Sequence, residues 1–205
     1  MILAPGVPGV AFGTLADGDG RNDPVARAAI AAELGIASEW ASVHQVHGPL
    51  IANVTLPGSQ GEADGMVTRV DGLPLVIGTA DCVPVALVGD ESIAMLHAGW
   101  RGVALGIVSR ALEGPLADTY SHAVLGPRIG PCCYEVDSDV VKAVGGFEAT
   151  TNHGTTSVDL GEAIISQVAD RVSVVDISFC TKCDDRFASH RRDGTKTRQV
   201  SLAWL

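Results

Sequence analysis

The sequence predicts a single α+β domain spanning residues 1–205. That length suits one domain of ordinary size. Apolar residues make up 46% of the chain and charged residues 19%, as in a protein with a packed core. The expected strands gather in the middle of the chain instead of alternating regularly with helices, which favours α+β over a doubly wound α/β fold. Because aromatic residues are only 4%, aliphatic side chains must fill the core.

The first expected element is a helix that begins at Pro24. Asp23 can cap its amino terminus, proline suits the first turn, and the stretch VARAAIAAEL follows before Gly35. Strands are then expected at 42–46 and 50–56, followed by a polar loop at 57–63.

Three short apolar segments follow in quick succession, at 73–80, 83–89 and 92–98. They are rich in branched side chains and bounded by Gly, Asp or Pro, which is typical of buried strands. The rest of the chain is expected to hold three helices and two strands: helices at 103–114, 137–146 and 160–172, and strands at 122–130 and 172–178.

The charge balance excludes one class of partner. Lys and Arg number 14 against 24 Asp and Glu, a net charge of −10. Such a surface repels phosphate backbones, so no nucleic-acid partner is expected. The densest basic stretch is adequate for one phosphate group and consists of Arg191, Arg192, Lys196 and Arg198.

A cytoplasmic location without a membrane partner is expected. No apolar run approaches the ~18 to 20 residues that a membrane helix needs. The apolar amino terminus lacks a charged leading region and is interrupted by Pro and Gly, unlike a signal peptide. The five cysteines are an odd number, which argues against a fully paired disulfide framework.

Three residues are candidate zinc ligands: His47, Cys82 and His97. His44 and His47 are three residues apart, so on a strand their rings face opposite sides and at most one serves a given site. Cys82 lies between two apolar strands, and His97 ends one, before a Gly-rich turn. A catalytic zinc takes three such ligands and keeps one position open. Taken singly, each also suits a structural role, as a surface histidine or a small buried thiol.

Several motifs occur together in a characteristic order: HQVHG (44–48), ADGMVT (63–68), TADCVPV (79–85), HAGWRG (97–102), GPRIGPCCYEV (126–136) and CTKCDDRFASHRRDGTKTRQ (180–199). Over about residues 40–205 the chain therefore resembles the YfiH-type family. Members have been called laccase-like multicopper polyphenol oxidases and are better described as purine nucleoside phosphorylases with adenosine deaminase activity. The resemblance implies a layered α/β/β/α sandwich with mixed sheets.

The resemblance also implies the ligands and substrates. The family's metal triad falls on His47, Cys82 and His97, which would hold Zn²⁺. The implied substrates are inorganic phosphate and adenosine, inosine or guanosine, with methylthioadenosine as a further candidate. One departure lies near the amino terminus, where relatives have a Ser-Thr-Arg-Gly-Gly pattern. This chain has Phe-Gly-Thr-Leu-Ala at 12–16 and lacks that arginine.

Other polar residues in these motifs are candidates for substrate contacts. Arg101, Arg191 and Arg192 could hold phosphate, because guanidinium pairs two hydrogen bonds with phosphate oxygens; surface ion pairing is the alternative. His190 either assists or faces solvent. Asp81 either orients a ligand, acts as a base, or is a buried structural carboxylate.

The remaining cysteines form a second possible group: Cys132, Cys133, Cys180 and Cys183. A Cys-x-x-Cys pair is half of many structural zinc sites. Adjacent cysteines rarely bind one metal together, however, and the resemblance implies no second metal. A buried packing role is therefore the favoured expectation.

Two rival functions are considered, and the first of them uses the same three residues. In a Cys–His hydrolase, Cys82 would be the nucleophile and His47 or His97 the base, acting on an amide such as that of a peptidoglycan precursor. A copper polyphenol oxidase needs many ligands in close His-x-His pairs, and this chain has six histidines and no such pair. One zinc per chain and little copper are therefore expected.

Overall fold

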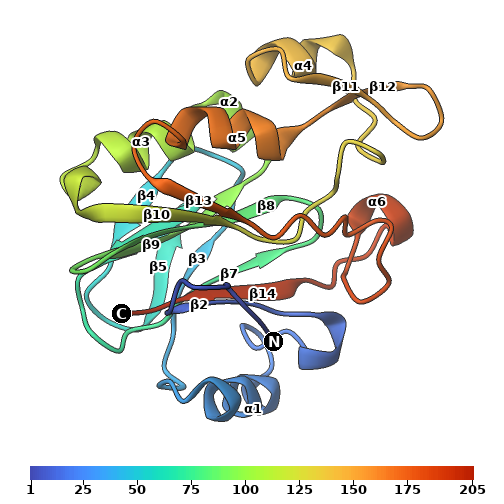
Figure 1. The fold of residues 1–205 in the computed structure, drawn as a ribbon. Coiled ribbons are helices and arrows are strands. Elements are labelled where there is room, and N and C mark those ends of the chain that lie inside the picture. The colour runs from blue at the N-terminus through green and yellow to red at the C-terminus, as the bar shows by residue number, and fades with distance from the viewer.

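Two mixed β-sheets lie face to face between helices in the computed structural model, which describes residues 1–205 apart from the side chain of Asp118 (Figure 1). The first sheet has the strand order β1 (Ile2–Leu3), β2 (Val10–Phe12), β14 (Gln199–Ala203), β7 (Leu75–Thr79), β3 (Ala41–His44) and β5 (Gly58–Glu62). The second has the order β13 (Ser173–Asp176), β10 (Tyr120–Leu125), β8 (Val83–Gly89), β9 (Ile93–Ala98), β6 (Gly65–Thr68) and β4 (Ile51–Asn53).

Helices cover the outer face of each sheet. Helix α1 (Pro24–Leu34) lies under the first sheet, while α2 (Trp100–Ala104), α3 (Ile107–Glu113) and α5 (Leu160–Val168) lie over the second (Figure 1). The smaller elements are α4 (Ser138–Ala143), α6 (His190–Asp193), the hairpin of β11 (Glu148–Thr150) and β12 (Thr156–Val158), and the 3₁₀ turns Leu15–Asp17 and Ala117–Thr119. Among the described residues, no helix combines the length and apolar character needed to cross a bilayer.

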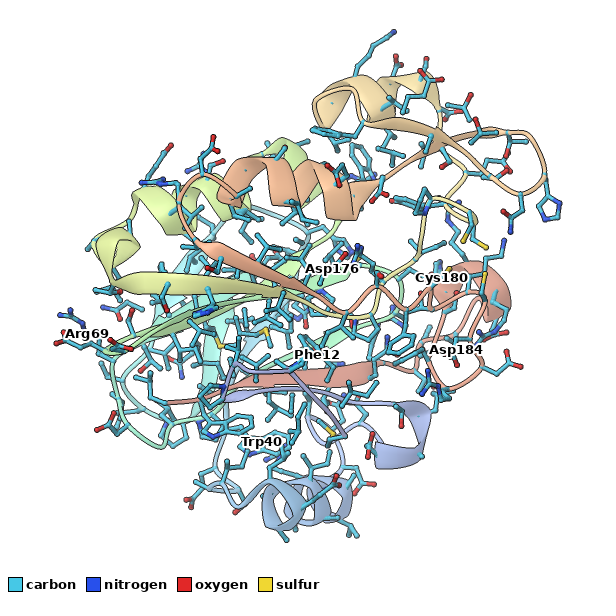
Figure 2. The ribbon with its side chains drawn as sticks, in the orientation of Figure 1. Phe12, Trp40, Arg69, Asp176, Cys180 and Asp184 are labelled. Atoms are coloured by element: carbon cyan, nitrogen blue, oxygen red, sulfur yellow. The ribbon has the colours of Figure 1, made fainter. Side chains whose placement is uncertain are left out.

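The hydrophobic side chains form three clusters, one for each boundary between layers. Along β8, Val85 and Leu87 pack toward the helices, whereas Ala86 packs between the sheets, as the two-residue period of a strand requires. Phe12 lies between the sheets and Trp40 lies beside α1 (Figure 2). The predicted α+β class and the α/β/β/α layering are thus confirmed.

The predicted helix starting at Pro24 is confirmed in both of its ends. The side chain of Asp23 accepts a hydrogen bond from the Val25 N–H at 2.8 Å, and Gly35 adopts the left-handed conformation with φ of 68°. The helix expected at 103–114 is instead two helices, α2 and α3. Gly106, with φ of 78°, breaks the helical path between them.

The strands predicted at 73–80, 83–89 and 92–98 are confirmed as β7, β8 and β9, but β7 joins the first sheet while its two successors join the second. The polar loop expected at 57–63 was wrong, because it contains β5. This exposed edge strand pairs in parallel with β3. Its extended conformation therefore depends on the hydrogen bonds to β3 and not on its own composition.

Candidate metal centre and its cavity

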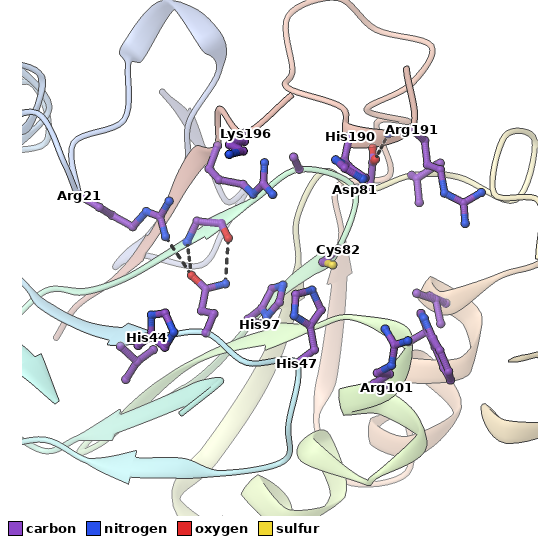
Figure 3. A pocket seen from close by; sticks show the side chains of 18 of the residues that line it. Arg21, His44, His47, Asp81, Cys82, His97, Arg101, His190, Arg191 and Lys196 are labelled. Carbon is purple, nitrogen blue, oxygen red and sulfur yellow. Dashed lines mark hydrogen bonds between the residues drawn. The ribbon is translucent and has the colours of Figure 1, made fainter. Parts of the chain in front are cut away.

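The three predicted ligands come from two connections and from the end of one strand, which meet at one end of the sheets. His47 lies between β3 and β4, Cys82 between β7 and β8, and His97 on β9 just before α2. Their ligand atoms all lie within 4.8 Å of one another. The two imidazole rings meet edge to face with their centroids 4.8 Å apart (Figure 3).

A buried carboxylate, Asp64, positions both histidines. Its Oδ1 lies 2.7 Å from Nδ1 of His97 and accepts the N–H of His47 at 2.9 Å, while its Oδ2 accepts the N–H groups of Val46 at 3.1 Å and Gly48 at 2.7 Å. These bonds hold His47 in a left-handed conformation with φ of 62°. Because Asp64 holds Nδ1, the Nε2 of His97 is the nitrogen available to a metal.

The electrostatics of the group favour a thiolate. Burial raises the pKa of the Cys82 thiol, but the charge of His97 and hydrogen bonds from both histidines outweigh it and lower that pKa to about 6. Burial lowers the pKa of His97, and the Cys82 thiolate together with Asp64 raises it to about 9. The thiolate is the form of cysteine that binds metals.

A glycine allows the ligands to meet. A Cβ at Gly99, the residue before α2, would lie 3.1 Å from both Cys82 Sγ and His47 Cδ2. Any larger side chain at that position would press on two ligands at once. This close approach explains why the Gly-rich turn follows His97.

The donor set fits a zinc ion with one open position. Two imidazoles and one thiolate are ligands of the type that zinc prefers, and three ligands leave a fourth place for water or substrate. His97 is 3% exposed, Cys82 half-buried and His47 exposed, so the open side faces solvent. The Asp64–His97 pair is the carboxylate–histidine arrangement that commonly supports such ligands.

The triad opens into a cavity of about 630 Å³, within the usual range for small-molecule sites. Cationic side chains line both sides of it, with Arg21 and Lys196 on one side and Arg101 and Arg191 on the other (Figure 3). Arg198 lines it as well. The cavity therefore gathers positive charge in a chain whose net charge is −10.

Arg101 and Arg191 both reach the cavity, as predicted for phosphate ligands, and each lies over an aromatic ring. The Cζ of Arg101 is 4.5 Å from the ring centroid of Trp100, and that of Arg191 is 5.0 Å from the ring centroid of Tyr134. Arg191 also donates to the carbonyl oxygen of Glu135 at 2.7 Å. Stacking of this kind holds a guanidinium in place while its edge stays available.

Arg192 does not line this cavity, contrary to the expectation that it contacts phosphate. Its guanidinium donates to the carbonyl oxygens of Thr181 at 2.9 Å and Phe187 at 2.8 Å and pairs with Asp193 at 3.0 Å. These bonds fasten the segment before α6. His190 lines the cavity and is exposed.

Asp81 lies at the cavity wall with both carboxylate oxygens in use. Oδ1 accepts from the Thr181 hydroxyl at 2.7 Å, and Oδ2 accepts from the Arg191 N–H at 2.7 Å. The residue is buried and has a φ of 86°. Of the roles considered from sequence, this geometry supports a structural carboxylate that positions Arg191.

Two residues at the site, Asp64 and Arg21, were not predicted from the sequence. Asp64 lies in the ADGMVT motif, where a carboxylate inside a buried stretch was the available signal. Arg21 had no such signal. Its guanidinium donates to Gln45 Oε1 at 3.1 Å and fills the space beside Gly78. The chain lacks the arginine of the amino-terminal family pattern, but Arg21 reaches this cavity.

With this geometry established, comparisons place the chain among known proteins. Residues 15–205 match the sequence profile of the family described as multi-copper polyphenol oxidoreductase laccase. The chain belongs to this laccase family.

Relatives within the laccase family carry other names. A purine nucleoside phosphorylase of Mycobacterium tuberculosis is 36% identical over 98% of this chain and 89% of its own length. The purine nucleoside phosphorylase YlmD of Geobacillus stearothermophilus is 33% identical over 90% of this chain and 80% of its own length. The family is thus one of enzymes, named for two different reactions.

Solved structures of the same family share the fold. The hypothetical protein YfiH of Bacillus licheniformis superposes with a TM-score of 0.80 at 28% identity, covering 91% of this chain and 82% of that one. YlmD of Geobacillus stearothermophilus gives a TM-score of 0.78 at 29% identity, covering 91% and 81%. The predicted YfiH-like fold is therefore confirmed.

Proposed function

We propose that this chain is a zinc-dependent purine nucleoside phosphorylase that also deaminates adenosine. The observation that carries the proposal is an open His47–Cys82–His97 triad at a cavity lined by cations, in a strongly acidic chain. Such a site suits a small anionic co-substrate. Relatives named purine nucleoside phosphorylase support the same reading.

The triad would hold the metal through His47, Cys82 Sγ and Nε2 of His97, with Asp64 behind them. Zinc bound there supplies Lewis acidity toward an oxygen atom in its open position. Thiolate ligands persist in a reducing compartment, and the five cysteines are unpaired, so we place the protein in the cytoplasm.

In phosphorolysis, the arginines do the positioning. A phosphate oxygen forms a bond to the anomeric carbon of the ribose while the bond from that carbon to the purine nitrogen breaks, and the purine takes up the proton that the phosphate gives up. The sugar becomes cation-like on the way, so placing the phosphate accurately lowers the barrier more than a covalent nucleophile would. Arg101 and Arg191 bind the phosphate oxygens, and Asp81 holds Arg191 in place through its N–H.

The purine would lie against the apolar part of the cavity wall, which consists of Ile129, Tyr134 and Leu160. This wall carries few fixed polar groups, so it suits adenosine, inosine and guanosine alike. Deamination adds water at C6 of adenine and releases ammonia, which requires proton movement at the ring. The exposed imidazoles of His44 and His190 line the cavity and are placed to move those protons.

The decisive experiment uses protein purified without added metal. We expect zinc at the triad, little copper, and release of free base from inosine only when phosphate is present. Ammonia release from adenosine should not need phosphate. Base release that is indifferent to phosphate would indicate hydrolysis, and several copper ions per chain with phenol oxidation would favour the reaction for which the family is named.

A Cys–His hydrolase is the second candidate, because Cys82, His97 and Asp64 lie in the order of a nucleophile, a base and its orienting carboxylate. In that mechanism His47 is expendable, whereas a metal centre needs it. His47→Ala should therefore remove both the triad zinc and the activity if the proposed function holds. Retained amide hydrolysis in a His47→Ala protein without metal at the triad would favour the hydrolase.

A further inference from the structure

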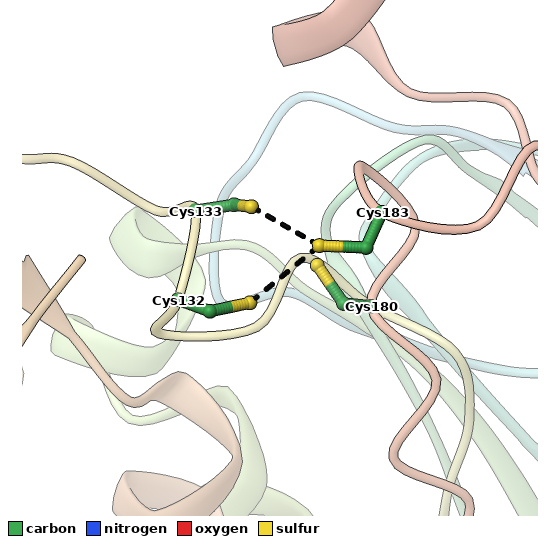
Figure 4. Close-up of side chains that lie close together, drawn as sticks. All are labelled: Cys132, Cys133, Cys180 and Cys183. Atoms are coloured by element: carbon green, nitrogen blue, oxygen red, sulfur yellow. Dashed lines mark hydrogen bonds between the residues drawn. The ribbon is translucent and has the colours of Figure 1, made fainter. Parts of the chain in front are cut away.

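We propose that this protein has a second zinc site, a structural one, formed by Cys132, Cys133, Cys180 and Cys183. These residues, called here the cysteine tetrad, come from two connections: the first pair lies between β10 and α4, and the second between β13 and α6. Their four sulfur atoms all lie within 4.8 Å of one another (Figure 4). Segments about fifty residues apart in the chain thus bring their thiols to one point.

The sulfur positions suit a tetrahedral ion. A Zn–S bond of about 2.3 Å places tetrahedral sulfurs about 3.8 Å apart. Cys183 Sγ lies 3.8 Å from Cys132 Sγ and 3.3 Å from Cys133 Sγ. One sulfur that lies close to two others indicates a shared centre, whereas disulfides would draw the thiols together in separate pairs.

A backbone amide donates to one sulfur of the tetrad. The Gly130 N–H donates to Cys180 Sγ at 3.2 Å. The Cys180–Cys183 turn is closed by hydrogen bonds from Cys183 N–H and Asp184 N–H to the Cys180 carbonyl oxygen, at 3.1 and 3.0 Å. An amide that donates to a ligating sulfur supports metal binding.

The adjacency of Cys132 and Cys133 does not prevent joint binding here. Both lie in a tight turn, because the N–H groups of Cys133 and Tyr134 both donate to the Gly130 carbonyl oxygen at 3.0 Å. The turn presents both thiols to the facing Cys180–Cys183 loop (Figure 4). Cys133 and Cys180 pack partly against the larger core, but Cys183 is exposed, so the packing role expected from sequence does not account for the whole group.

The tetrad would brace one wall of the cavity. Tyr134 follows Cys133 directly and carries the Arg191 guanidinium on its ring. Thr181 follows Cys180 and donates to the Asp81 carboxylate. Four thiolates leave no open position on zinc, so the ion would join two irregular loops without taking part in chemistry.

Metal counting tests this site independently of the triad. Protein purified under reducing conditions without added metal should contain two zinc ions per chain. Cys82→Ala should contain one, and Cys132→Ser/Cys183→Ser should also contain one while melting about 10 °C lower. Because the Cys82→Ala protein lacks the triad metal, its remaining zinc reports the tetrad whatever reaction the cavity performs.

A second measurement keeps the test decisive if the double variant fails to fold. Cys82→Ala protein reconstituted with Co²⁺ should show the intense sulfur-to-cobalt absorption of a four-thiolate site, and its tetrad cysteines should resist alkylation until the metal is removed. A metal-free Cys82→Ala protein with four freely alkylated thiols would overturn the proposal. So would disulfides found among these cysteines in freshly purified, unreduced protein.

Discussion

The triad and the cysteine tetrad are both compact groups of metal-binding side chains, yet they are built in opposite ways. The triad takes its ligands from two connections between strands and from the end of β9, and a buried carboxylate orients two of them. The tetrad takes its ligands from two loops, and one backbone amide donates to one of its sulfurs. One offers three ligands beside a cavity, and the other offers four.

From this difference we expect the triad to serve catalysis and the tetrad to serve stability. A centre with an open position needs rigid ligands, because the substrate must meet the metal at a fixed angle. The strands that flank the three ligands belong to both sheets and provide that rigidity. A closed centre instead supplies order to segments that have no regular structure, and the connections around Gly130 and Lys182 are of that kind.

The largest expected effect separates the two sites by activity and stability. Cys82→Ala should abolish both base release and ammonia release and lose the triad zinc. Cys132→Ser/Cys183→Ser should lower the melting temperature but keep a measurable part of both activities. The measurements are the two assays and a thermal melt on each variant. If the tetrad variant is fully inactive at a temperature where it remains folded, the division of tasks is wrong.

The next largest effect concerns Asp64, which only the triad has. In Asp64→Asn, the amide nitrogen must face either a backbone N–H or the His97 ring, since the carboxylate accepts from both. Zinc affinity at the triad should fall about 10- to 100-fold. A competition titration with a chromophoric chelator measures it. The Asp176→Asn variant, which removes a partly exposed carboxylate paired with Arg128, is the control and should leave triad affinity unchanged.

The sequence predicted much of the triad because its three ligands lie within recognisable motifs beside buried strands. It also predicted the helix from Pro24 to Leu34, since capping residues and apolar periodicity are local signals. The layers were predicted by the resemblance to the family. The role of Asp64 was not predictable in this way. Its partners lie 16 to 33 residues away, so only the folded chain brings them together.

Other misses have the same physical origin. The strand at Gly58–Glu62 exists because β3 pairs with it. Convergence of the tetrad is likewise a long-range property, because the sequence of two short cysteine motifs does not show how far apart they lie in the folded chain. Arg192 was assigned to phosphate by its place in a basic stretch, whereas its guanidinium serves the loop before α6.

A smaller effect should distinguish an arginine that lines the cavity, Arg101, from one that stabilises a loop behind it, Arg192. Arg101→Met should raise the phosphate concentration needed for half-maximal base release about 10-fold, because one exposed charge-assisted contact is lost. Ammonia release from adenosine should change little. Arg192→Met is the matched control, expected to reduce stability and both activities in parallel. Equal loss of both activities in Arg101→Met would assign that residue to the purine or the fold.

The smallest effect uses a pair of glycines that stand in equivalent relations to the two sites. In Gly99→Ala, the new Cβ would lie 3.1 Å from Cys82 Sγ, and zinc affinity at the triad should fall several-fold. In Gly130→Ala, the new Cβ would lie 3.3 Å from Cys132 Sγ, and the melting temperature should fall by a few degrees. Neither glycine has a positive φ, so backbone strain does not confuse the comparison. Each substitution should disturb its own site and spare the other, which zinc titration and thermal melts of both variants will measure. If Gly99→Ala instead lowered only the melting temperature, the close approach at the triad would serve packing rather than ligand placement.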